Sequence, residues 1–275
     1  MTDISEKPSG WEAQFLGEEL TRDENNEAAA LFHVLPFGLE KTVSYGSGTA
    51  NGPAAIIEAS HQLERWLEGD EPCRHGIFTT PEIDCSGDIQ SCLKNLTQAV
   101  FSAASRKHIP IILGGEHSLT YGAIMGLRAV FDQPIGIIQI DAHADLREAY
   151  QGEPHSHASV MHLLGQKNVP IYQLGVRALC QEEADRRKEY NIGYKDASEL
   201  VRGQISNVSL PEDFPEQVYI SFDLDGLDPA IMAATGTPVP GGLGFYQALD
   251  LLASAVEGRK IIGADIVELA PRPAH

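Results

Sequence analysis

The feature that most constrains the fold is an alternation of short apolar runs with segments that read as helices, regular from residue 88 onward. Apolar runs without interruption are typical of strands buried on both faces. Such an alternation predicts an α/β fold with a mostly parallel sheet and helices on both sides. The expected strands are 32–36, 109–113, 135–140, 171–174, 218–222 and 261–266; the expected helices are 54–60, 88–105, 118–130, 159–164, 181–190 and 244–256.

Three clusters of acids and histidines each follow one of these apolar runs. The clusters are GGEHS at 114–118, DAHAD at 141–145 and SFDLDGLDP at 221–229. Asp141, His143 and Asp145 stand two residues apart, so in an extended chain their side chains face one way. Asp223 and Asp225 share this spacing. Because ligands of parallel sheets bind beyond the carboxyl ends of the strands, the clusters are expected to meet there, where crowded carboxylates require a cation.

Carboxylates and imidazoles without a nearby thiol favour a hard or borderline divalent metal such as manganese. The candidate ligands are too many for one catalytic ion with an open position, but they fit two ions. Two such ions about 3.5–4 Å apart share a water and lower its pKa towards neutrality. Each fragment also has a simpler interpretation: Asp141 as a helix cap, His143 as a core histidine, and residues 223–226 as part of a calcium loop. That loop would lack its third acid and distal glutamate.

The charge balance limits the partners. The chain has 20 Lys+Arg and 39 Asp+Glu, a formal net charge of −19. This balance argues against nucleic acid or an anionic membrane and suits a small cationic substrate. The start has no apolar signal segment and no run reaches 18 apolar residues, so a cytoplasmic protein without a membrane span is expected. The cysteines are expected to be reduced and structural; they are Cys73, Cys85, Cys92 and Cys180.

The 275 residues are enough for one large domain. Residues 1–30 are polar and lack a clear period, so they are expected to form an N-terminal arm that is either mobile or an oligomer contact. Residues 31–275 are then expected to form a single catalytic domain.

Taken together, the three clusters resemble the signatures of the ureohydrolase family, which includes arginase and agmatinase, in order and spacing over about residues 30–270. The resemblance implies a three-layer α/β/α fold of the arginase/deacetylase type, with a mainly parallel sheet of about eight strands. It also implies two Mn²⁺ ions per subunit and a homotrimer or homohexamer. One ion would be held by His117, Asp141, Asp145 and Asp223, and the other by Asp141, His143, Asp223 and Asp225, with Asp141 and Asp223 bridging.

Further positions match family residues with catalytic roles. His157 resembles the active-site histidine that shuttles protons, with His155 as a rival by spacing. Glu268 resembles the carboxylate that binds the guanidinium, a strong and directional pair. For His157 and Glu268 the simpler interpretation is a surface residue. Asp145 is counted with them as catalytic, and Asp228 is expected either to order the ligand loop or simply to cap it.

The resemblance implies hydrolysis of a guanidinium C–N bond to urea and an amine. Arginases carry an asparagine two residues after the last acid of the second signature, where this chain has Arg147. The substrate is therefore expected to be agmatine, giving putrescine in polyamine biosynthesis. Glu148 and Glu153 favour a distal ammonium unless both face solvent, whereas Arg147 suits guanidinobutyrate. A hydrolase of another amidine, such as formiminoglutamate or guanidine, and a catalytically silent binding subunit remain alternatives.

Family members usually continue beyond the last strand with another helix, whereas here only residues 271–275 follow the segment around Glu268. Parallel sheets need cover on both faces. We therefore expect a truncated chain, or cover from a neighbouring subunit or the N-terminal arm. Compared with a version extended by such a helix, lower stability or an altered oligomer is expected.

Overall fold

The computed structural model describes residues 11–271, and these form an eight-stranded sheet in which every pairing is parallel. The strand order is β2-β1-β3-β8-β7-β4-β5-β6. The strands are β1 (Phe32–Phe37), β2 (Ile77–Thr79), β3 (Ile109–Gly114), β4 (Ile135–Ile140), β5 (Ile171–Leu174), β6 (Gly193–Lys195), β7 (Gln217–Asp223) and β8 (Lys260–Val267).

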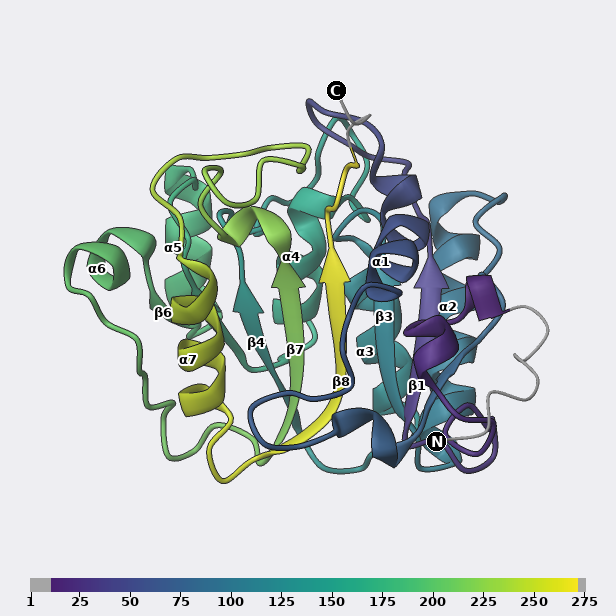
Figure 1. Cartoon of the computed structure of the whole chain (residues 1–275). Coiled ribbons are helices and arrows are strands. Elements are labelled where there is room, and N and C mark those ends of the chain that lie inside the picture. Colours follow the sequence, from purple (N-terminus) through teal and green to yellow (C-terminus); the bar gives the residue numbers. More distant parts are fainter. Residues whose placement is uncertain (1–10, 272–275) are drawn as a thin grey trace.

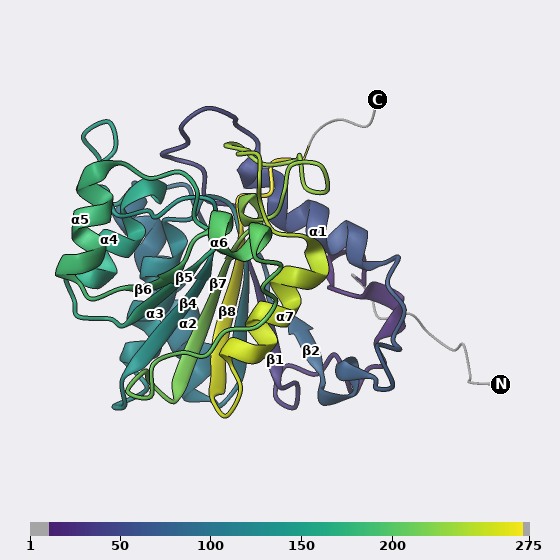
Figure 2. The same cartoon turned by 90° about the vertical axis from the view of Figure 1, so that its left-hand side faces the viewer.

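Helices lie on both sides of the sheet (Figures 1 and 2). α2, α3, α4 and α5 cover one side, while α1 and α7 lie on the other. This arrangement confirms the expected three-layer α/β/α fold. The helices are α1 (Gly52–Ser60), α2 (Ile89–Ser105), α3 (Leu119–Arg128), α4 (Val160–Gly165), α5 (Gln181–Glu189), α6 (Ala197–Arg202) and α7 (Phe245–Ala255).

β4 shows why the apolar runs are uninterrupted. All six of its residues are buried. Ile135 and Ile137 join the core on one side of the sheet, whereas Ile138 and Ile140 join the core on the other. Because alternate side chains enter two separate cores, every position of the strand has to be apolar or internally hydrogen-bonded.

Two short edge strands, β2 and β6, and helix α6 were not predicted. Each of these strands has three residues, and β6 includes a glycine and a lysine. Segments this short show too few alternations of apolar and polar residues to predict a strand. They widen the sheet without contributing to the three clusters.

The part of the expected N-terminal arm that the structure describes is packed against the domain. Leu16 and Leu20 are buried beside Cys73. The backbone N–H of Leu16 donates to Oγ of Ser60, at the end of α1, at 2.9 Å. The pair Phe15-Leu16 and the single Leu20 are too few to define a helix or strand period, so the sequence shows none there. Residues 1–10 lie outside the described residues.

The sheet side that carries α1 and α7 is less completely covered than the other. Between these two helices, side chains of the neighbouring strands β7 and β8 remain partly exposed: Ile220, Phe222, Ala264 and Ile266. The question of a C-terminal covering helix concerns residues after 271, which lie outside the described part, so that expectation stays a prediction.

Within residues 11–271, no helix combines the length and the apolar character needed to cross a membrane. The four cysteines, expected to be reduced, form no disulfide.

Candidate metal centre and active site

The three acid-and-histidine clusters meet at one edge of the sheet. They follow β3, β4 and β7, and Glu268 follows β8, which lies between β3 and β7. Since all strands are parallel, these four chain segments emerge at the same edge. The predicted convergence beyond the carboxyl ends of the strands is therefore confirmed.

The local backbone differs from the extended chain that the spacing suggested. β4 ends at Ile140, and Asp145 has a φ of 53°, in the left-handed region. The carbonyl of Asp145 accepts hydrogen bonds from the backbone N–H groups of Met161 and His162, at 3.0 and 3.2 Å. A loop anchored to the start of α4, rather than strand alternation, therefore aims Asp145 at the site.

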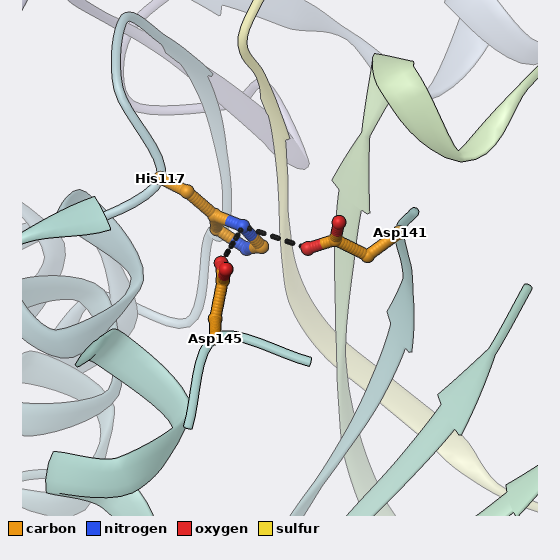
Figure 3. Close-up of side chains that lie close together, drawn as sticks. All are labelled: His117, Asp141 and Asp145. Carbon is orange, nitrogen blue, oxygen red and sulfur yellow. Dashed lines mark ion pairs between the residues drawn. The ribbon is translucent and has the colours of Figure 1, made fainter. Parts of the chain in front are cut away.

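His117 is the centre of the first group of candidate ligands (Figure 3). Its Nδ1 lies 2.9 Å from Oδ2 of Asp145 and 3.1 Å from Oδ2 of Asp141, which approach the ring from two directions. Oδ2 of Asp223 lies 3.4 Å from the same nitrogen. Three carboxylates thus face one imidazole nitrogen in a buried site.

The far side of the His117 ring fixes which nitrogen carries the proton. The carboxylate of Asp265 accepts hydrogen bonds from the hydroxyls of Ser221, Thr120 and Tyr219, at 2.9, 2.7 and 2.8 Å. Ser221 Oγ lies 2.8 Å from Nε2 of His117. Because a hydroxyl has one proton and Ser221 gives it to Asp265, Ser221 accepts from Nε2–H.

This arrangement leaves Nδ1 of a neutral His117 as a bare lone pair facing carboxylate oxygens. Nδ1 is buried and has no hydrogen bond of acceptable geometry. Lone pairs of a nitrogen and of carboxylates repel unless a cation lies among them. The donor set therefore fits a metal ion, with the hydrogen bond on the other ring nitrogen that metal-bound histidines commonly make.

A second group lies beside the first. His143 Nδ1 is 3.0 Å from Oδ2 of Asp225 and 3.6 Å from Oδ1 of Asp141. Asp141 belongs to both groups, which fits its predicted bridging role. Asp223, the other expected bridge, lies near His117 but is part of neither group, and its Oδ1 accepts from the backbone N–H of Asp225 at 2.8 Å.

Without an ion, several of the crowded and buried acids of the site have raised pKa values. Burial and the charge of Asp141 raise the pKa of Asp145 to about 7. Burial and the charges of Asp225 and Asp141 raise the pKa of Asp223 well above its ordinary value. Burial also raises the pKa of Glu268, to about 8. The site thus favours positive charge, whether protons or metal ions supply it.

Most candidate residues line one cleft of about 470 Å³. Asp141 is fully buried and does not line it. The predicted residues that line it are His117, His143, Asp145, Arg147, His157, Asp223, Asp225 and Glu268. The cleft is thus large enough for a small extended ligand beside the two groups.

His157, rather than its rival His155, lies in the cleft. His157 packs edge-on against Tyr150, with ring centroids 5.3 Å apart. Its pKa is lowered by burial. His155 instead packs against Tyr121 outside the cleft, with centroids 5.7 Å apart.

The acids of the following loop do not line the cleft. Glu148 is 82% exposed and pairs with Arg186 at 3.5 Å. Glu153 lies 3.5 Å from His155. The suggestion that these acids bind a distal ammonium therefore finds no support in their positions. Asp228 accepts backbone N–H bonds from its own loop, including that of Gly242 at 3.0 Å. These bonds agree with both of its interpretations, so its role stays a prediction.

Several residues of the site were missed from the sequence. The hydroxyls of Thr42 and Ser44 lie 3.1 and 2.6 Å from the two ring nitrogens of His157. Glu116, quoted within a cluster but given no role, is fully buried behind Thr42. The loop of Thr42 and Ser44 has no pattern that signals this contact, because their partner lies more than 110 positions away.

The guanidinium of Arg177 was also missed. It donates to backbone carbonyls in the ligand loop after β7, among them those of Asp225 at 2.7 Å and Gly226 at 3.2 Å, and to that of Val239 at 2.6 Å. Arg177 thus fixes the backbone that carries a candidate metal ligand.

Comparison with known proteins places these features in a family. The family model described as Arginase family matches residues 30–275. A Synechocystis protein named N(1)-aminopropylagmatine ureohydrolase is 34% identical over 269 residues, covering 94% of this chain and 86% of the relative. A protein of Pyrococcus horikoshii named agmatinase is 32% identical over 240 residues, covering 86% of this chain and 82% of the relative.

Solved structures agree with the sequence comparisons. The crystal structure of agmatine ureohydrolase of Thermoplasma volcanium superposes with a TM-score of 0.78 at 27% identity, covering 92% of this chain and 86% of the other. Arginase from Medicago truncatula superposes with a TM-score of 0.79 at 26% identity, covering 88% of this chain and 80% of the other.

Proposed function

Because this chain belongs to the arginase family and is a hydrolase of amidine C–N bonds, we propose that it is a dinuclear manganese enzyme that releases urea and an amine from a small cationic guanidino compound. The observation that carries the proposal is the pair of carboxylate–imidazole groups that share Asp141 beside a cleft. Oxygen and imidazole ligands without thiolate suit manganese.

The proposed ligands fall into the two groups that the geometry defines. His117, Asp141 and Asp145 would hold one ion, and Asp141, His143 and Asp225 the other, with Asp223 added to both as a bridge in the proposal. A pair of divalent ions supplies a water whose pKa is lowered and a positive field for charge that develops on the substrate.

The other residues of the cleft bind the substrate and move protons. The carboxylate of Glu268 would pair with the guanidinium and orient its carbon, since such pairs are directional. His157, which lines the cleft, would give a proton to the departing amine. Both residues line the same cleft as the metal ligands.

The substrate is proposed to be agmatine, with N(1)-aminopropylagmatine as a second candidate. The second candidate rests on the printed name of the Synechocystis relative. The cleft also contains Arg147, which keeps guanidinobutyrate as an alternative because an arginine pairs with a distal carboxylate.

Urea release from these compounds and from L-arginine, assayed side by side with Mn²⁺, tests the proposal. Turnover of agmatine or its aminopropyl derivative above that of L-arginine supports it. No urea from any of them would refute it and leave a hydrolase of another amidine or a silent binding subunit.

The cytoplasmic location and the homotrimer or homohexamer belong to the same proposal. Light scattering of the purified protein measures the assembly, and a monomer would contradict it.

A further inference from the structure

The buried carboxylate of Glu116, outside the two candidate metal groups, is connected to His157 through hydrogen bonds of Thr42. Glu116 is fully buried and accepts hydrogen bonds from four donors. These are the backbone N–H groups of Lys41 and Thr42 and the hydroxyls of Thr42 and Ser118. Four donors fill the acceptor sites of an ionised carboxylate, which has no proton of its own to give.

The hydrogen bonds of Thr42 can therefore be assigned. Its hydroxyl donates its single proton to Oε1 of Glu116, at 2.8 Å. Oγ1 of Thr42 also accepts the backbone N–H of His157 at 3.1 Å, and it lies 3.1 Å from Nδ1 of the His157 ring. A hydroxyl has one donor and two lone pairs, so with the proton already given to Glu116 it can only accept from the ring.

From this accounting we propose that Glu116, acting through Thr42, holds neutral His157 in the tautomer that carries its proton on Nδ1. Glu116 and Thr42 are then positioning residues, and Nε2 of His157 is the atom that exchanges protons. Ser44 Oγ, 2.6 Å from Nε2, donates to it in this arrangement. Because Nε2 of this tautomer is bare, it would first take up a proton from water in the cleft and then give that proton to the departing amine. The catalytic consequence rests on the proposed function, whereas the tautomer itself does not.

The hydrogen-bond chain predicts a different effect for each of three substitutions. In Glu116→Gln, the new carbonyl oxygen can accept the two backbone N–H groups, which turns the new amide NH₂ towards Thr42. The Thr42 hydroxyl then accepts from that amide and gives its proton to Nδ1, so the tautomer reverses to Nε2–H. Thr42→Val removes the acceptor of Nδ1–H, whereas Thr42→Ser keeps it.

Long-range ¹H–¹⁵N spectra of histidine-labelled protein with Mg²⁺ added read the tautomer directly. The signals of the His157 ring are identified by their disappearance in the His157→Gln variant. We expect a protonated Nδ1 and a bare Nε2 in the wild type and in Thr42→Ser, and the reverse in Glu116→Gln. A wild-type ring protonated on Nε2 overturns the proposal without any variant, and so does an unchanged tautomer in a folded Glu116→Gln protein.

Kinetics give a second readout. Thr42→Val should lower kcat about tenfold to a hundredfold, within the range of acid–base contributions, with KM changed less than about twofold. Thr42→Ser should restore kcat. Thr80→Val makes the same change at a hydroxyl that donates to the carbonyl of Pro81 outside the cleft, and it is the matched control. A fall in kcat that Thr42→Ser does not restore would contradict a role for the hydroxyl.

The outcomes separate this inference from the proposed function. Wild-type protein with the Nδ1–H tautomer but without urea release would keep the hydrogen-bond chain and refute the proposed release of urea. Full activity in His157→Gln would refute the proton-carrying role of His157 and, with it, the catalytic part of the inference.

Discussion

The backbone N–H of His117 donates a hydrogen bond of 2.7 Å to Oε1 of Glu268, which joins two residues 151 positions apart. In return, the N–H of Glu268 donates to the carbonyl of Gly115 at 2.8 Å. These bonds hold Glu268 at a φ of 65°, a conformation that costs a residue with a side chain about 1–2 kcal/mol. The candidate guanidinium ligand and a candidate metal ligand therefore share one rigid frame.

Glu268→Gln should lower kcat/KM about a hundredfold, which is about 3 kcal/mol of transition-state binding, because the charge of the guanidinium pair is lost. The new amide oxygen can still accept from His117, so metal content should stay the same. Steady-state kinetics and metal analysis check both points. Glu148→Gln makes the same change at an exposed acid and is the control. Near-normal kcat/KM in Glu268→Gln would remove Glu268 from the substrate site.

Chelation should abolish activity, and added Mn²⁺ should restore it. Asp141→Asn should lose the most bound metal, because Asp141 belongs to both groups, and Asp223→Asn should also lose metal if Asp223 bridges. Equilibrium dialysis followed by elemental analysis measures the loss. Asp132→Asn, at an exposed acid away from the cleft, is the matched control. Unchanged turnover by chelated, metal-free protein would refute the dinuclear site.

L-Arginine should be a poorer substrate than agmatine, because Arg147 stands where arginases carry an asparagine and that residue is therefore missing from the site. Arg147→Ala should abolish any guanidinobutyrate turnover, since the partner of the distal carboxylate is removed. Urea release from the three compounds measures both effects. Arg202→Ala, at an exposed arginine on α6, is the control. Arginine turnover equal to that of agmatine would show that Arg147 does not select the substrate.

Stability should fall as the pH drops from about 6.5 to about 4, in part because of His33. Burial and the stacked ring of His108, 3.9 Å away between centroids, lower the pKa of His33 to about 4. In this window the unfolded chain binds more protons at His33 than the folded chain, so acid favours unfolding.

His33→Gln should therefore lose less stability than the wild type between pH 7 and pH 5. Denaturant titrations at the two pH values measure the difference in unfolding free energy. His75→Gln, at an exposed histidine, should behave like the wild type. An identical pH dependence in wild type and His33→Gln would exclude the stacked pair as a cause.

The sequence predicted those strands and candidate ligands that depend on neighbouring residues in the chain. β4 and β5 were predicted to the residue, because their apolar runs are bounded by polar or turn-forming neighbours. The candidate metal ligands could be predicted because parallel strands bring the residues that follow them to one edge of the sheet. The left-handed turn at Asp145 could not be predicted, since it depends on the contact with α4. Thr42 and Ser44 carry no local signal, and only the folded chain shows their contact with His157.

Asp145 serves two parts of the fold at once. Its carboxylate faces His117, while its carbonyl accepts the amides of Met161 and His162 in the first turn of α4, just after His157. An ion that restrains the carboxylate also restrains the carbonyl on the same residue. Metal loading of the centre would therefore be thermodynamically linked to the order of the segment that carries His157. Slower hydrogen–deuterium exchange of the Met161 and His162 amides in the loaded protein would be the signature of that linkage.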